Sequence, residues 1–169
     1  MKIFFASLGC DKNLVDSEVM LGILSKKGYE FTDDETEADI IVVNTCCFIG
    51  DAKEESVNTI LEMAEYKKEG NCKALIVTGC LAERYRQEIT EEITEVDAVL
   101  GTTAYDRIAG AIEDALGKKS TLKYGDTDRL VLADAERILT TGGHYAHLKI
   151  AEGCDKHCTY CIIPRLRGA

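Results

Sequence analysis

The chain has 169 residues, of which 46% are hydrophobic and 30% charged, so it is long enough for one globular domain and a little more. Its formal net charge of −10 argues against a general phosphate-binding surface, because such surfaces are basic. We therefore expect no direct nucleic-acid binding from this segment. No apolar run approaches the length of a transmembrane helix, and we expect a cytoplasmic protein with no membrane partner.

Eight cysteines are many for this length. Their even number would also fit an exported disulfide protein, which needs a signal sequence. The apolar stretch from Ile3 to Gly9 is at the short end of signal peptides. In a cytosolic chain such cysteines more often bind metal or take part in chemistry, and we expect that here.

Short apolar runs alternate with helical patterns along the first two thirds of the chain. Continuous apolar runs predict strands over 2–7, 39–44, 73–79 and 97–101, each covered on both faces. A helical pattern follows each run, and the alternation predicts an α/β fold with a parallel sheet and helices on both faces. The helical apolar positions are Val15, Val19 and Ile23; Val57, Ile60, Leu61 and Ala64; Leu81, Tyr85, Ile89 and Ile93; and Ile108, Ile112 and Leu116.

The pattern divides the chain into three parts. Residues 1–117 form the α/β domain. Over 118–143 the periodicity fades and turn residues dominate, so this part is predicted to be a linker. Residues 144–169 open with "HYAHLKIAEGC", which predicts the first strand of a new domain.

Three cysteines follow three predicted strands directly. Cys10, Cys46 and Cys80 should meet at one rim, because the carboxyl ends of parallel strands share one edge of a sheet. Backbone N–H groups at the following helix starts should favour their thiolate forms. A metal or cluster site competes with the alternative that buried cysteines act as small hydrophobes. For Cys47 and Cys72 we expect only that structural role.

Three further cysteines, Cys154, Cys158 and Cys161, lie close together with the spacing C-x3-C-x2-C. Such spacing suits an iron–sulfur cluster or zinc. For zinc, a fourth ligand is available from three histidines. In a cluster with four irons, three thiolates leave one iron open. The histidines are His144, His147 and His157.

The second motif, with Tyr160 before its last cysteine, resembles the cluster motif of radical S-adenosylmethionine enzymes. Four stretches in order, "SLGCDKNLVDSE", "NTCCFIGDAKEES", "VTGCLAERY" and "KIAEGCDKHCTYCIIPRLRG", resemble the methylthiotransferases of that superfamily, and within them the RimO type. Asp11 stands where that type usually has Pro, and Cys47 where it usually has Gly.

This resemblance implies two 4Fe–4S clusters. Cys154, Cys158 and Cys161 would hold the cluster that binds S-adenosylmethionine, with Tyr160 near the adenine. Cys10, Cys46 and Cys80 would hold an auxiliary cluster with an open iron. Asn13 and Asn44 flank the auxiliary site, where turn formation competes with hydrogen bonding to the cluster. The loop of the second motif would follow the first strand of a β/α barrel.

The resemblance also implies the reaction, insertion of a methylthio group at an aspartate of small-subunit ribosomal protein twelve. This reaction would need two clusters that face one shared pocket. It would also need a reductant such as flavodoxin or ferredoxin. A barrel needs on the order of 200 residues, so we expect this chain to be an N-terminal fragment that is inactive alone. The alternatives are a tRNA adenosine methylthiotransferase and a non-catalytic iron–sulfur or zinc module.

Overall fold

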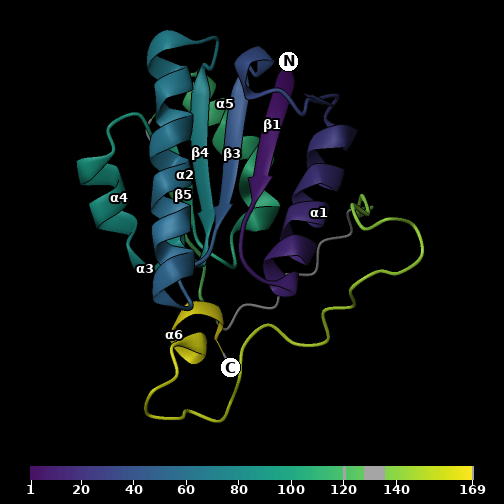
Figure 1. The fold of residues 1–169 in the computed structure, drawn as a ribbon, viewed down its shortest axis with the longest axis vertical. Coiled ribbons are helices and arrows are strands. Elements are labelled where there is room, and N and C mark those ends of the chain that lie inside the picture. The colour runs from purple at the N-terminus through teal and green to yellow at the C-terminus, as the bar shows by residue number, and fades with distance from the viewer. Residues whose placement is uncertain (120, 128–135, 169) are drawn as a thin grey trace.

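A computed structural model describes residues 1–119, 121–127 and 136–168, and in them one parallel sheet of six strands runs in the order β2-β1-β3-β4-β5-β6 (Figure 1). The strands are β1 (Lys2–Ser7), β2 (Glu30–Phe31), β3 (Ile40–Thr45), β4 (Ala74–Gly79), β5 (Ala98–Leu100) and β6 (Thr121–Lys123). The helices are α1 (Asp11–Lys26), α2 (Gly50–Glu69), α3 (Cys80–Arg84), α4 (Arg86–Glu92), α5 (Ile108–Leu116) and α6 (Ile163–Arg167). Two short 3₁₀ helices are η1 (Glu35–Glu37) and η2 (Tyr105–Arg107).

Helices cover both faces of the sheet, which confirms the predicted α/β class (Figure 1). Successive residues of a strand point to opposite faces. In β3, Ile40 and Val42 therefore pack toward α1 and α5, whereas Ile41 and Val43 pack toward α2, α3 and α4. All four side chains are fully buried, which explains why β3 reads as one continuous apolar run.

The structure differs from the prediction in the short elements. β2 and β6 were not predicted, because two or three residues are too few to show a period. β6 pairs with β5 inside the segment predicted to be a linker, of which residues 128–135 lie outside the described residues. The helix expected over Leu81–Ile93 is broken at Tyr85, whose backbone (φ −120°, ψ 39°) is not helical. On α2, Leu61 is 48% exposed because it lies one residue beyond the buried Ile60.

The strand expected in residues 144–154 is wrong for this structure, where they run without pairing to any described strand. A strand needs a neighbour to share its backbone hydrogen bonds. Here Leu148 and Ile150 are 83% and 91% exposed. The end of this segment is tied to α1 instead, because Lys12 Nζ donates to the carbonyl of Ala151 at 3.0 Å.

Residues 136–140 also lie against α1. The buried carboxylate of Glu18 accepts hydrogen bonds from Arg137 Nε at 2.6 Å and from the Thr140 N–H at 2.7 Å. Burial alone would raise the pKa of Glu18, but these hydrogen bonds hold it below its ordinary value. At Gly22 a Cβ atom would stand 1.6 Å from the carbonyl oxygen of Glu136, so only glycine admits this approach.

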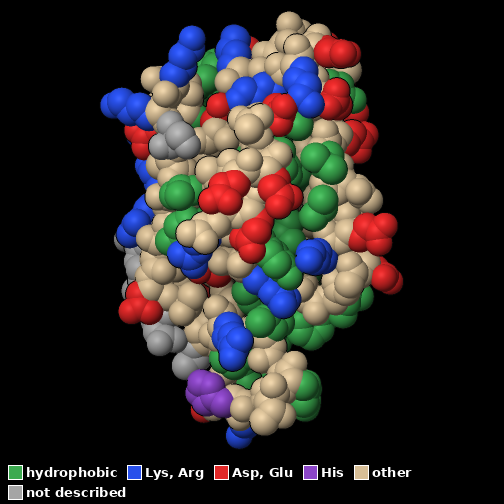
Figure 2. Space-filling model, turned by 90° about the vertical axis from the view of Figure 1, so that its left-hand side faces the viewer, with side chains coloured by type: hydrophobic (Ala, Val, Ile, Leu, Met, Phe, Trp, Pro, Cys, Tyr) green, Lys and Arg blue, Asp and Glu red, His purple; other side chains and the backbone are tan. Residues whose placement is uncertain are grey.

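The surface shown in Figure 2 carries Lys, Arg, Asp and Glu interspersed over its upper part and more hydrophobic side chains lower down. Within the part of the chain that the structure describes, no helix combines the length and the apolar character needed to cross a bilayer.

Candidate metal centre at the carboxyl edge of the sheet

Cys10, Cys46 and Cys80 line one cavity of about 1030 Å³. The register explains why two of them are neighbours. Thr45 and Gly79 pair as the last residues of β3 and β4, and they are followed directly by Cys46 and Cys80. Cys10 stands three residues beyond β1, which pairs with β3 on the other side. The sheet thus brings three cysteines from distant parts of the sequence to one edge.

This cavity lies at the point where the chain reverses its direction of winding. In the order β2-β1-β3-β4, the connection after β1 moves one way along the sheet and that after β3 the other. The loops diverge between β1 and β3, and ligands of open α/β sheets bind at such a switch point. Cys10 and Cys46 stand on either side of it.

Two glycines allow the thiols to approach each other. Gly9 has φ +92°, and a Cβ on it would stand 2.5 Å from the Cβ of Cys46. Gly79 has φ +95°, and a Cβ there would stand 2.4 Å from both Asn44 Oδ1 and the Thr45 carbonyl oxygen. L-residues rarely adopt this backbone conformation, so both positions require glycine.

Buried polar side chains fix the loops of the cavity. Ser56 Oγ on α2 accepts from the N–H of Cys46 and donates to its carbonyl, both at 2.9 Å. Asn13 Nδ2 donates to the carbonyls of Leu8 and Thr45, at 2.9 and 2.8 Å. Asn44 Nδ2 donates to the carbonyl of Asn13 at 2.9 Å. The two asparagines therefore hold the backbone at the strand ends, as expected for turn chemistry.

Cys80 is buried, with 8% of its surface exposed. Burial raises the pKa of its thiol, and the guanidinium of Arg167 partly offsets this effect. The expectation that helix N–H groups would favour the thiolate is therefore wrong for Cys80 in the metal-free chain. The reason is that α3 is a single short turn, whose field is weak against the cost of burial. A bound metal would supply the charge that stabilises the thiolate.

Cys47 and Cys72 both belong to the hydrophobic core on the α2 side of the sheet, Cys47 next to the cavity and Cys72 before the start of β4, at the opposite edge of the sheet. Cys47 Sγ donates to the carbonyl of Cys80 at 3.2 Å, and burial raises its pKa to about 11. Cys72 Sγ donates to the carbonyl of Ala74 at 3.3 Å, and burial raises its pKa as well. Neither lines the cavity, in agreement with the structural role expected for both.

The second group of cysteines lies on the loop before α6. Cys158 and Cys161 line a neighbouring cavity of about 670 Å³ together with His157 and Tyr160. Cys154 stands at the base of this loop, where its N–H donates to the carbonyl of Gly168 at 3.0 Å. Tyr160 is 90% exposed. The other two histidines do not line this cavity, and His147 lies 3.6 Å from Asp11 instead.

The two cavities adjoin. Phe48 and Ile49, in the loop between β3 and α2, line both, and they are 60% and 57% exposed. α6 contributes Leu166 to the first cavity and Pro164 to the second. The helix is held against the sheet edge by Thr102, whose Oγ1 donates to the carbonyl of Leu166 at 2.5 Å.

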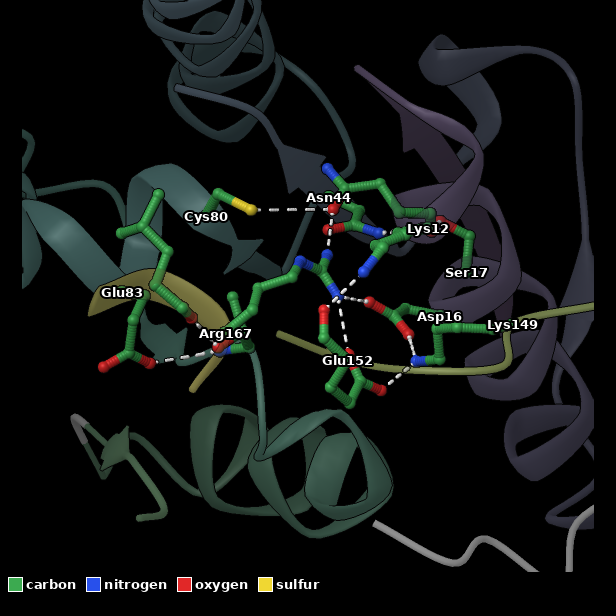
Figure 3. A network of polar contacts seen from close by, with 12 residues as sticks. Lys12, Asp16, Ser17, Asn44, Cys80, Glu83, Lys149, Glu152 and Arg167 are labelled. Atoms are coloured by element: carbon green, nitrogen blue, oxygen red, sulfur yellow. Dashed lines mark hydrogen bonds and ion pairs between the residues drawn. The ribbon is translucent and has the colours of Figure 1, made fainter. Parts of the chain in front are cut away.

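A buried polar network lies beneath α6, at the back of the first cavity (Figure 3). Arg167 Nη1 pairs with Asp16 Oδ2 at 2.8 Å and with Glu152 Oε2 at 3.0 Å, and Lys149 pairs with both carboxylates. Arg167 Nη2 donates to Asn13 Oδ1, which also accepts from Cys80 Sγ at 3.8 Å. Sequence reasoning missed this network. The stretch "KIAEGCDKHCTYCIIPRLRG" contains both Arg165 and Arg167, but nothing in it tells which arginine is buried.

Within residues 1–119, 121–127 and 136–168, no three His, Cys, Asp or Glu side chains converge closely enough to hold a single metal ion. A cubane cluster spreads its thiolates over several irons, so its ligands stand farther apart than those of one ion. Three thiols around one cavity are a donor set that fits such a cluster. Arg167, which is paired with Asp16 and Glu152, also lines the first cavity.

Residues 2–101 match the family described as "Uncharacterized protein family UPF0004". Over 168 residues the chain is 68% identical to "Ribosomal protein uS12 methylthiotransferase RimO" of Lachnoclostridium phytofermentans, a match that covers 99% of the chain and 38% of that protein. Proteins of the same name from Acetivibrio thermocellus and Trichlorobacter lovleyi are 54% and 51% identical, again over 99% of the chain. The chain thus spans less than two fifths of the length of these relatives.

Proposed function

The chain belongs to the family UPF0004, and from this membership we propose that it is the N-terminal part of a radical S-adenosylmethionine methylthiotransferase of the RimO type. The proposed reaction places a methylthio group on an aspartate of ribosomal protein uS12, the substrate in the names of the relatives. The place of the reaction is the cytoplasm, where a reductant such as flavodoxin or ferredoxin supplies electrons.

One observation carries this proposal. Cys10, Cys46 and Cys80 line one cavity, Cys158 and Cys161 of the second group line the adjoining cavity, and Phe48 and Ile49 line both. Each group would supply three thiolates to a 4Fe–4S cluster and would leave its fourth iron without a protein ligand. Sites at adjoining cavities would let one cluster supply the radical and the other the sulfur to the same substrate carbon. A module for electron transfer alone needs no open iron and no shared apolar wall.

The residues have defined tasks in this proposal. Cys10, Cys46 and Cys80 hold the auxiliary cluster. Cys154, Cys158 and Cys161 hold the second cluster, which binds S-adenosylmethionine. When bound, these groups supply the sulfur and the radical that removes hydrogen from an unactivated carbon, a step beyond acid–base chemistry.

The chain's own side chains shape the place of reaction. Phe48 and Ile49 give the boundary between the two sites an apolar wall, with more than half of each side chain exposed. Tyr160 stands free beside Cys161, where its ring can pack on the adenine of S-adenosylmethionine. Lys12 lines the auxiliary cavity and brings a positive charge to it, with its Nζ donating to the carbonyls of Ala151 and Glu152.

The test joins this chain to the remaining part of the Lachnoclostridium phytofermentans relative. The chimera is reconstituted anaerobically with iron and sulfide and offered uS12 or tRNA with S-adenosylmethionine and dithionite. We expect mass spectrometry to find a methylthio group on one aspartate of uS12. The Cys10/Cys46/Cys80 triple alanine variant should still cleave S-adenosylmethionine to 5′-deoxyadenosine but should not modify uS12. Modification of tRNA and not of uS12 would refute the assigned substrate.

A further inference from the structure

Arg167 occupies an unusual position for a charged side chain. It is 4% exposed, although it lies on α6, a helix of five residues at the edge of the molecule. Its neighbour Arg165, two residues earlier on the same helix, is exposed. A buried guanidinium loses its hydration, which is strongly unfavourable unless the group is fully paired. The groups that pair with Arg167 therefore indicate which parts of the chain its burial holds together.

Three segments meet at this one side chain (Figure 3). Asn13 and Asp16 belong to α1, Glu152 precedes the second cysteine motif, and Arg167 follows it. The Cys154 N–H also bonds to the carbonyl of Gly168, next to Arg167. Arg167 thus holds together the two ends of the loop that carries the second cysteine group, Glu152 before it and Arg167 itself after it. Through Asn13 the same guanidinium reaches the cavity of the first group.

The charges at this point nearly cancel. Arg167 and Lys149 face Asp16 and Glu152, two cations against two carboxylates. Lys149 lies on the far side of Asp16, with its Nζ 5.0 Å from the ring centroid of Tyr105. Arg167 is the cation of this network that lines the cavity with Cys80, and it shares the acceptor Asn13 Oδ1 with Cys80 Sγ. The network therefore presents its positive end to the cysteine.

We propose that Arg167 is a positioning residue that joins the two cysteine sites and keeps a buried positive charge beside Cys80, which raises the reduction potential of an iron–sulfur cluster held there. The inference rests on the proposed function for the cluster itself. One electron from the reductant adds a negative charge to the cluster. A nearby buried cation stabilises this reduced form more than the oxidised form, and burial keeps water from screening the effect.

The redox test uses the 169-residue chain with Cys154, Cys158 and Cys161 replaced by alanine, so that only the auxiliary cluster is read. Dithionite titration followed by electron paramagnetic resonance gives its midpoint potential. We expect R167Q to lower the potential by at least a tenfold change in the reduction equilibrium, about 59 mV for a one-electron couple. R167K should recover more than half of the loss. The matched control R165Q, on the same helix, should leave the potential unchanged.

A second variant reverses the sign. D16N removes one carboxylate partner of Arg167 and should raise the potential, and it keeps the test decisive if R167Q fails to fold by circular dichroism. Hydrogen exchange of the metal-free chain gives a readout independent of the cluster. R167Q, but not R165Q, should speed exchange at the Cys154 amide, because the two ends of the loop are no longer held together.

The outcomes separate the inference from the proposed function. If the auxiliary cysteines bind iron and sulfide but R167Q and D16N leave the potential unchanged, the charge role of Arg167 is wrong while the function stands. If they bind none, the proposed function fails, and hydrogen exchange alone decides whether Arg167 joins the segments. If R167Q left hydrogen exchange at the Cys154 amide unchanged, the inference that Arg167 joins the segments would be overturned.

Discussion

Ser56 offers a direct test of how α2 shapes the auxiliary site. Its hydroxyl is fully buried and makes two hydrogen bonds of 2.9 Å, from the N–H and to the carbonyl of Cys46. Ser56→Ala removes both hydrogen bonds, and alanine is a better helix former than serine, so helix propensity does not add to the loss. The N–H of Cys46 is then left inside the protein without a partner.

The expected cost follows from this geometry. A buried donor without a partner costs about 1–3 kcal/mol, and the carbonyl loses one of its hydrogen bonds as well. We expect a loss of about 2 kcal/mol in the free energy of unfolding. For a chain of this length that corresponds to a fall in Tm of about 4–8 °C. Cys46 should also become free to shift, so the auxiliary site should hold less iron after reconstitution.

The measurement is thermal unfolding of the metal-free chain by circular dichroism, followed by iron analysis. Thr59→Ala is the matched control, because Thr59 lies one turn away on α2 with an exposed hydroxyl bonded to the Glu55 carbonyl. It should change stability by less than about 0.5 kcal/mol. If Ser56→Ala and Thr59→Ala behaved alike, the claim that Ser56 holds the Cys46 loop would be refuted.

Three further predictions use other features of the chain. In chemical denaturation, Gly9→Ala should lower the free energy of unfolding more than Gly28→Ala does. Both glycines have positive φ, which costs an alanine about 1–2 kcal/mol, but of the two only Gly9 would place its Cβ against another atom, the Cβ of Cys46 at 2.5 Å. Equal losses would contradict the close packing at Cys46. Glu18→Gln should destabilise the chain by about 1–2 kcal/mol near pH 7. Because the folded state lowers the pKa of Glu18, the wild-type advantage should be present above its ordinary value of 4.5 and vanish as the pH falls through the lower folded value; a gap that persisted in acid would contradict this. Cys46→Ala should abolish the auxiliary cluster in iron analysis, whereas Cys47→Ala should retain it; the reverse result would exchange their roles.

The fold was predictable where one residue type repeats over several turns or a whole strand. The runs at β1, β3 and β4 each hold four consecutive apolar residues or more, and the predicted positions agree with the structure within one residue. The resemblance of the four motifs to the RimO type is confirmed by relatives that are 51–68% identical over 99% of the chain. The meeting of the cysteines near strand ends followed from parallel strands alone.

The polar parts of the site could not be predicted. Asp16 and Glu18 lie on α1 among residues that read as an exposed helix face, yet both are buried because residues 136–152 cover them. Helical periodicity reports contact with the sheet, not contact with a segment more than a hundred residues away. Arg165 and Arg167 look equivalent in sequence, and only the docking of α6 buries one of them.

The central claim is that this chain carries two separate cluster sites. Iron and acid-labile sulfide per chain, measured after anaerobic reconstitution of the wild type and of the Cys10/Cys46/Cys80 triple alanine variant, test it most directly. We expect about eight irons and eight sulfides in the wild type and about four of each in the variant. About four irons in both proteins, or zinc without sulfide, would contradict it.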